Sequence, residues 1–425
     1  MNKRAFCAVL LMVLSLIWTP ETSGQTSDAL PVLYIGGRWT VWRFDPNTMT
    51  SEVIYSVRDE SRVPVASLSP NEQGALAALD LPQVPSTLSA QVGGLWKLSD
   101  GRLLLKVDHF ACNYLINAEA CAGYAELVIL DTDKTTRSIF RLEYHDPLIP
   151  DQLSEANGTK IGYVEVNPTY EQAVIDLYGA NCYYCYLIDS WGLLIDFSGP
   201  TVQLAEMPYS YNFNWSPDGE KLAYFDLSGC VGVEIIEECQ ADLRFRENSS
   251  IYSIATVPEV PPGPDDTYYS PNAYQYSLLW KDSNTLIFEQ RIAGGFHRAE
   301  ALVWYDLVTD SMTYHPLQEL PRIHISTLGL GGNFVGTIRN SYPEEPIQVI
   351  LSGDPSLTVL KTLEGYRILT TVDDTYLIME EDSKYTTTFA ETGIFILMPD
   401  FQIVKVLLPP EILEDPNNWV YLIAG

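Results

Sequence analysis

The sequence predicts an all-β protein that folds as a single β-propeller of about seven four-stranded blades, with eight blades as the alternative. Three observations predict this fold. A strand–turn–strand hairpin recurs along the chain, three similar strands follow one another at a constant interval, and both ends of the chain form strands that can pair. We therefore expect residues 25–425 to form one propeller domain.

The clearest hairpin covers residues 213–226. Pro217 presets φ for a tight turn, and Asp218-Gly219 supplies a position with positive φ. Apolar residues on both sides form two short strands, so this stretch is interpreted as a hairpin. Eroded copies are expected at residues 66–79, 95–105 and 280–288.

A constant interval supports a repeated blade. Tyr305, Leu351 and Leu397 lie in similar apolar strands, and each is 46 residues from the next. Such a period is typical of a four-stranded propeller blade. The inner strand pairs that precede these three strands are expected at residues 276–290, 324–339 and 366–380.

The first half of the chain is less regular. Its equivalent positions are expected at Phe44, Leu130, Ile195 and about Ile254. The 86 residues from Phe44 to Leu130 are too many for one plain blade. Either one blade carries a large insertion with Cys112 and Cys121, or an eighth blade lies there.

The two ends of the chain predict how the ring closes. Residues 31–35 form a strand that begins before any complete blade, and residues 419–424 form a final aromatic and β-branched strand. If they pair, they complete one sheet and remove two exposed edges. We expect this closure.

Residues 1–24 have the features of a secretory signal peptide. Lys3-Arg4 precede an apolar run over residues 8–18, and Thr22-Ser23-Gly24 provide small residues for cleavage. The run is too short to span a membrane comfortably. We expect a soluble monomer that is exported to the periplasm or the extracellular space, with no membrane span after signal removal.

Six cysteines follow the signal peptide, in three pairs that are local in sequence. An exported protein favours disulfides over free thiols, so local pairing is expected. A redox role for the Cys182/Cys185 motif is disfavoured because no helix is expected there, and zinc lacks a second ligand pair. The six residues are Cys112, Cys121, Cys182, Cys185, Cys230 and Cys239.

The formal net charge of −30, from 25 basic and 55 acidic residues, limits the partners. Nucleic acid is disfavoured because phosphates require a basic surface. A soluble protein with a basic or neutral ligand fits this charge better.

No catalytic set is evident in the sequence. There is no G-x-S-x-G motif, and none of the acidic clusters matches a calcium loop. The glycines of residues 329–336 are interpreted as a turn between strands rather than a phosphate loop. No cofactor and no metal are expected. The histidines lack a close metal-ligand partner; they are His109, His145, His297, His315 and His324.

A proline-rich segment at residues 257–266 leads into a group of tyrosines. Its prolines exclude a regular helix or a central strand, so an exposed loop is expected. Tyrosine is a rigid, amphipathic contact residue. The candidate ligand-binding residues are therefore Asp265, Asp266, Tyr268, Tyr269, Tyr274 and Tyr276.

The Ser216-Pro217-Asp218-Gly219 hairpin, with Lys221-Leu222-Ala223-Tyr224 after it, resembles the repeat of TolB-like, or WD40-like, propellers. In that family the motif joins the two inner strands of a blade, which implies the same fold here. TolB carries an α/β domain before its propeller, whereas here the first strand follows almost directly on the signal peptide. The resemblance implies the fold and does not imply TolB's role in an envelope complex.

Two functions are consistent with these features. The first is a secreted, non-catalytic binding or scaffold propeller that docks a protein or glycan ligand through its loops. The alternative is an extracellular enzyme that acts on glycans or peptides with carboxylates at the propeller mouth. We favour binding because no catalytic set is evident, although propellers support many activities.

Overall fold

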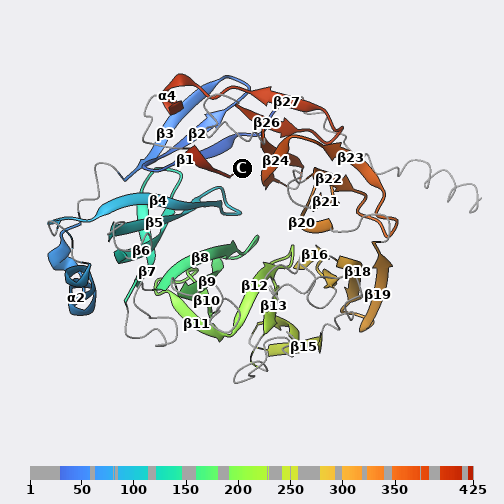
Figure 1. Ribbon diagram of the computed structural model, residues 1–425, viewed down its shortest axis with the longest axis horizontal. Coiled ribbons are helices and arrows are strands. Elements are labelled where there is room, and N and C mark those ends of the chain that lie inside the picture. Colours follow the sequence, from blue (N-terminus) through green and yellow to red (C-terminus); the bar gives the residue numbers. More distant parts are fainter. Residues whose placement is uncertain are drawn as a thin grey trace, which may run out of the picture.

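The computed structural model describes residues 29–57, 63–79, 81, 85–112, 121–145, 159–179, 191–226, 228, 242–248, 250–256, 278–291, 299–317, 323–338, 347–373, 375–381, 393–413 and 420–424. The strands among them form seven antiparallel sheets of four strands each, arranged as blades around a central axis (Figure 1). The prediction of an all-β propeller with about seven blades is confirmed.

Six blades are formed by strands that are consecutive in the chain. In each, the first strand lies nearest the central axis (Figure 1). The six are β4 (Ser89–Lys97), β5 (Leu103–Cys112), β6 (Cys121–Leu130) and β7 (Thr136–Glu143); β8 (Thr159–Val166), β9 (Gln172–Gly179), β10 (Trp191–Asp196) and β11 (Gln203–Pro208); β12 (Ser210–Trp215), β13 (Lys221–Asp226), β14 (Asp242–Glu247) and β15 (Ser250–Thr256); β16 (Leu278–Asp282), β17 (Thr285–Arg291), β18 (Ala299–Asp306) and β19 (Ser311–Pro316); β20 (Ile323–Gly329), β21 (Asn333–Ile338), β22 (Ile347–Leu351) and β23 (Val359–Leu363); and β24 (Tyr366–Val372), β25 (Tyr376–Glu381), β26 (Ile394–Leu397) and β27 (Ile403–Val406).

The seventh blade joins the two ends of the chain, as predicted. It consists of β28 (Val420–Ala424), β1 (Leu33–Gly37), β2 (Thr40–Asp45) and β3 (Thr50–Ser56), in that order. β28 pairs with β1 so that Ile423 lies opposite Ile35 and Leu422 opposite Gly36. The C-terminal strand therefore supplies the inner edge of a blade that the N-terminal segment begins.

The hairpin around Ser216 is the inner hairpin of its blade, as predicted. The Gly219 N–H donates to Ser216 O at 2.8 Å, and Gly219 has φ 74°. The Ser216 hydroxyl contacts Asp218 at 2.6 Å and also accepts the Lys221 N–H at 2.9 Å. Side-chain and main-chain bonds together hold the turn between β12 and β13.

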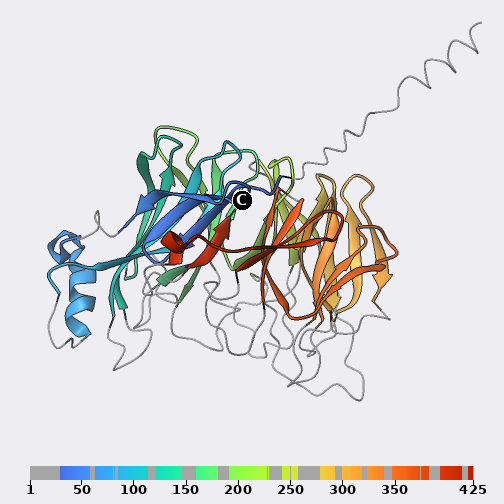
Figure 2. The same cartoon turned by 90° about the horizontal axis from the view of Figure 1, so that it is seen from above.

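Residues 66–79 do not form the hairpin that the sequence predicted. They include a short 3₁₀ helix, Val65–Ser67, and the helix α2, Pro70–Ala78. Ser69 is the N-cap of α2 and accepts the Glu72 N–H, while Pro70 takes the first helical position, where no N–H is needed. This insertion between β3 and β4 accounts for the long interval from Phe44 to Leu130, and Figure 2 shows it at the periphery of the ring.

The positions predicted as equivalent are mostly confirmed. Phe44, Leu130, Ile195, Tyr305, Leu351 and Leu397 all lie on the third strand of a blade. Ile254 was assigned wrongly, because it lies on β15, the fourth strand, and the third strand of that blade is β14. The residues 95–105 and 280–288 form inner hairpins as expected, and Leu330 to Gly332 form the predicted turn between β20 and β21.

Cys112 and Cys121 form a disulfide at the adjacent ends of β5 and β6. Local pairing is confirmed for this pair, while Cys182, Cys185, Cys230 and Cys239 lie outside the described residues. Within the described ranges, no helix has the length and apolar character needed to cross a membrane.

Candidate functional site

The six residues predicted to bind a ligand are Asp265, Asp266, Tyr268, Tyr269, Tyr274 and Tyr276. All six lie in residues 257–277, outside the described part of the chain. Their role stays a prediction, and the described residues offer a different candidate site.

A pocket of about 530 Å³ lies between the β8–β11 blade and the β12–β15 blade. The first blade contributes Tyr170, Gln172, Leu194, Asp196 and Leu204, among others. The second contributes Trp215, Glu220, Leu222, Arg246 and Asn248. Volumes of about 300–1,000 Å³ are usual for sites that hold small ligands. The predicted SPDG hairpin thus forms part of one wall.

Trp215 is the last residue of β12 and lines this pocket. Its side chain is largely buried, with 8% of the residue exposed. The indole nitrogen is buried and has no hydrogen-bond partner among the described residues. An unsatisfied buried donor costs about 1–3 kcal/mol, so such a group in a pocket requires an explanation.

Trp280 provides an internal comparison for Trp215. Trp215 pairs with Leu222 across its inner hairpin, and Trp280 pairs with Leu286 in the same place one blade later. The Trp280 indole N–H donates to Asn214 O of the preceding blade at 2.9 Å. The indole N–H of Trp280 therefore has a protein acceptor at its blade interface. The equivalent N–H of Trp215 has none within the described chain.

The size of Leu194 helps to explain why the pocket exists. Asp196 and Asp306 end the third strands of their blades, and each accepts the main-chain N–H two residues later. Counting back from these aspartates aligns Leu194 with Trp304. A leucine therefore lies where the β16–β19 blade has a much larger indole.

The facing residue differs in the same direction. Leu222 of β13 pairs with Trp215 of β12, and Phe334 of β21 pairs with Leu328 of β20. Leu222 and Phe334 therefore occupy equivalent positions on the second strands of their blades. The rings of Trp304 and Phe334 approach within 6.3 Å and fill the interface between their blades. Leu194 and Leu222 have smaller side chains in place of both rings, and both line the pocket together with Trp215.

Polar groups surround this space. The Asp196 carboxylate accepts Gln172 Nε2 at 2.9 Å and the Ser198 N–H at 3.0 Å. Burial alone would raise the pKa of Asp196, but the hydrogen bonds from Ser198 and Gln172 hold the pKa below its usual value. On the other wall Arg246 Nε donates to Asn248 O at 2.9 Å. The pocket is therefore lined by a carboxylate, Asp196, and a guanidinium, Arg246, that are both positioned by hydrogen bonds.

Two acidic residues of the β8–β11 blade have perturbed pKa values. A bulge in β8 places Gly162 and Tyr163 opposite Asp176 of β9, and Tyr163 Oη donates to Glu165 at 2.5 Å. Burial raises the pKa of Glu165 to about 7 and that of Asp176 to about 7. These carboxylates lie on adjacent strands of one blade.

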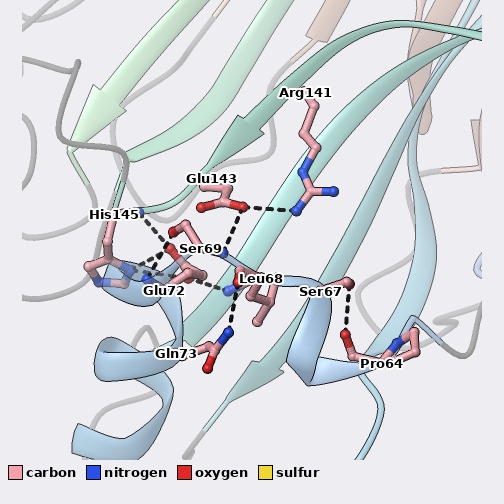
Figure 3. A network of polar contacts seen from close by, with 10 residues as sticks. Pro64, Ser67, Leu68, Ser69, Glu72, Gln73, Arg141, Glu143 and His145 are labelled. Carbon is pink, nitrogen blue, oxygen red and sulfur yellow. Dashed lines mark hydrogen bonds and ion pairs between the residues drawn. The ribbon is translucent and has the colours of Figure 1, made fainter.

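Two of the histidines, His109 and His145, contact other side chains within the fold. His109 is buried and stacks on Tyr124, with ring centroids 4.6 Å apart, and burial lowers the pKa of His109 to about 4. His145 lies beside Glu72 of α2, as Figure 3 shows. The described residues contain no group of three or more His, Cys, Asp or Glu side chains arranged to hold a metal ion.

The contacts in Figure 3 fix the α2 insertion to its blade. Glu72 is fully buried, and its carboxylate accepts the Gly123 N–H and the His145 N–H, the latter at 2.9 Å. The neighbouring Glu143 accepts the Ser69 N–H and pairs with Arg141. This network is an anchor for the helix rather than an open site.

No protein-family model matches the chain, and no curated protein matches it. Solved propellers do. The β-propeller domain of the Trilobed protease from Pyrococcus furiosus is 11% identical, with 88% of this chain and 91% of that chain covered and a TM-score of 0.49. TolB from Acinetobacter baumannii is 14% identical, with 67% and 65% covered and a TM-score of 0.34.

A prolyl oligopeptidase, enzyme B from Galerina marginata, is 10% identical, with 89% of this chain covered and a TM-score of 0.48. This chain spans 48% of that enzyme and less than two thirds of TolB. TolB, whose repeat the Ser216 hairpin resembles, is thus among the similar structures. The protein is a seven-bladed β-propeller with a pocket between two of its blades.

Proposed function

We propose that this protein is a non-catalytic binding propeller and that it holds its ligand in the pocket between the β8–β11 and β12–β15 blades. The observation that carries the proposal is the buried indole N–H of Trp215, which lines the pocket and has no acceptor in the described chain. The nitrogen is covered in the free protein, so a ligand oxygen reaches it when a neighbouring side chain moves aside, and it then supplies the missing acceptor. Export of the protein and its monomeric state belong to the same proposal.

Binding at this position is favourable for a physical reason. The desolvation cost of the Trp215 donor has already been met in the free protein, so a ligand acceptor that reaches the donor recovers this cost. Most of the wall residues lie on strands of the two blades, and the others lie in the short turns that connect those strands, which limits the ordering cost of binding.

The enzyme alternative has one supporting observation, the raised pKa values of Glu165 and Asp176. Groups that titrate near neutral pH suit acid–base catalysis. However, Glu165 already accepts a hydrogen bond from Tyr163, and the two carboxylates do not face each other from different blades. We therefore rank catalysis second.

The test is a thermal-shift screen with four compound classes: neutral oligosaccharides, uronic-acid oligosaccharides, short peptides and nucleotides. A ligand at 100 times its Kd stabilises the folded state by about 2.7 kcal/mol. An unfolding entropy of about 2.1 cal/mol/K per residue converts this into a rise in Tm of roughly 3 °C for a chain of this length.

The matched variant is Leu194→Trp, which introduces at this interface the residue that Trp304 provides at another. We expect it to fill the pocket, keep the propeller folded and abolish the Tm rise. The reciprocal variant, Trp304→Leu, should leave the rise unchanged. If no class stabilises the wild type, or if Leu194→Trp responds equally, the pocket is not the binding site.

A further inference from the structure

The pocket combines hydrogen-bond donors and acceptors of several kinds, and this combination bears on its ligand. Arg246 offers N–H donors, Trp215 adds an indole N–H that is covered in the free protein, and Asp196 and Glu220 offer carboxylate acceptors. Gln172 and Asn248 carry amides, which both donate and accept. A ligand must therefore present donors and acceptors close together over one small surface.

The charge of the lining disfavours an ionic ligand. Asp196 and Glu220 are acidic and Arg246 is basic, so the formal charge of the lining is about −1, within a protein of net charge −30. An anion would be repelled by this field. A cationic ligand would be repelled by the Arg246 guanidinium, and one without an acceptor oxygen would leave the Trp215 N–H unsatisfied.

The lining is also unusually polar for a site that takes apolar side chains of a peptide. Ligand pockets of that kind are mostly hydrophobic with few polar groups. Here most of the lining side chains are polar, and the apolar ones are Leu194, Leu204, Ala205 and Leu222. Tyr170, which is 47% exposed, adds an aromatic ring at the rim.

We infer that the ligand is a neutral oligosaccharide, an inference that rests on the proposed binding function. Each sugar hydroxyl both donates and accepts, so one hydroxyl oxygen accepts the Trp215 N–H while others donate to Asp196 and Glu220. The exposed ring of Tyr170 offers an apolar surface for the C–H face of a sugar. Asp196 stays ionised at neutral pH and remains an acceptor for these hydroxyls.

The test starts with an array of neutral and uronic-acid oligosaccharides, with a short-peptide array in parallel. The best neutral hit is then titrated calorimetrically into wild type, Trp215→Phe and Trp304→Phe. Trp215→Phe keeps an aromatic ring and removes only the donor. Trp304 also has a buried indole nitrogen without a partner in the described chain but lies outside the pocket, so it is the matched control.

We expect neutral oligosaccharides to bind, Trp215→Phe to weaken binding at least tenfold, and Trp304→Phe to leave the Kd within twofold. Preference for uronic-acid oligosaccharides, or equal binding by wild type and Trp215→Phe, overturns the inference. If peptides alone bind and Leu194→Trp abolishes that binding, the sugar inference fails while the proposed binding function stands. If nothing binds on either array, both fail.

Discussion

The indole nitrogen of Trp280 donates a hydrogen bond to the main-chain carbonyl of Asn214 at 2.9 Å, across the interface between two blades. Trp215 occupies the same place one blade earlier, beside a pocket rather than a protein acceptor. The repeated fold thus contains its own reference for what a satisfied tryptophan looks like at this position.

This contrast predicts different stabilities for two equivalent substitutions. Trp280→Phe removes the donor and leaves the Asn214 carbonyl without it, which should lower the free energy of unfolding by about 1 kcal/mol. Trp215→Phe removes a donor that has no protein partner and with it a desolvation cost of about 1–3 kcal/mol, so its free energy of unfolding should exceed that of Trp280→Phe by about 1 kcal/mol or more. Urea denaturation of the ligand-free proteins measures both values, and equal losses would contradict the contrast.

Removal of the closing strand should destabilise the ring. Deletion of residues 419–425 removes β28 and exposes the edge of β1 that pairs with it. We expect Tm to fall by roughly 5 °C or more, where the lost stability is converted into a Tm change with an unfolding entropy of about 2.1 cal/mol/K per residue. Deletion of residue 425 alone is the control, and an unchanged Tm for the longer deletion would show that closure contributes little.

The buried Glu72 carboxylate should be needed to hold the α2 insertion. Glu72→Gln replaces one acceptor oxygen with an NH₂ group, which leaves the N–H of Gly123 or His145 unsatisfied. We expect a loss of about 2–4 kcal/mol of unfolding free energy or local release of the helix. Limited proteolysis of residues 57–88 separates these two outcomes.

Gln73→Ala serves as the control in the same helix, because it removes one side-chain hydrogen bond to Leu68 O. It should cost about 1 kcal/mol or less. If Glu72→Gln behaves like Gln73→Ala, the network in Figure 3 does not anchor the insertion.

Asp176 should make stability depend on pH. Its folded pKa of about 7 lies above the unfolded value of about 3.9, so the folded state binds more protons between these values. Stability is therefore lost as pH rises from about 4 to about 7. Asp176→Asn should remove this loss and be more stable than wild type at pH 8, by on the order of 2 kcal/mol, with a smaller difference at pH 4.

Urea denaturation of both proteins across this pH range measures the effect. Asp133→Asn is the control, because Asp133 is exposed in a turn where hydrogen bonds from Thr135 lower its pKa. It should give no stabilisation at pH 8. A constant difference between wild type and Asp176→Asn at all pH values would contradict a raised pKa.

Much of the fold could be predicted from the sequence because turn chemistry and strand spacing are local. The Ser69-Pro70 pair predicts a turn, because Ser-Pro also begins the Ser216 turn, but it begins a helix in the structure. The two differ three residues later, where Glu72 completes the capping-box pattern and Gly219 supplies a positive φ. That signal was present in the sequence and distinguishes helix from hairpin.

The pocket could not be predicted in the same way, because it is defined by size differences between blades. Its origin is visible only when Leu194 is aligned with Trp304 and Leu222 with Phe334, which requires the strand register. The unsatisfied donor of Trp215 depends on where a neighbouring blade places its carbonyl groups, and no local pattern encodes that.

The most direct test of the account observes the Trp215 indole proton itself. In ¹H–¹⁵N spectra of the protein, the indole signal that disappears in Trp215→Phe identifies Trp215, and the one lost in Trp280→Phe identifies the reference. On titration with the best neutral oligosaccharide, we predict that the Trp215 signal shifts and becomes protected from exchange, while the Trp280 signal does not. A Trp215 signal that is unchanged at saturating ligand would contradict the central claim that this N–H is the donor to the ligand.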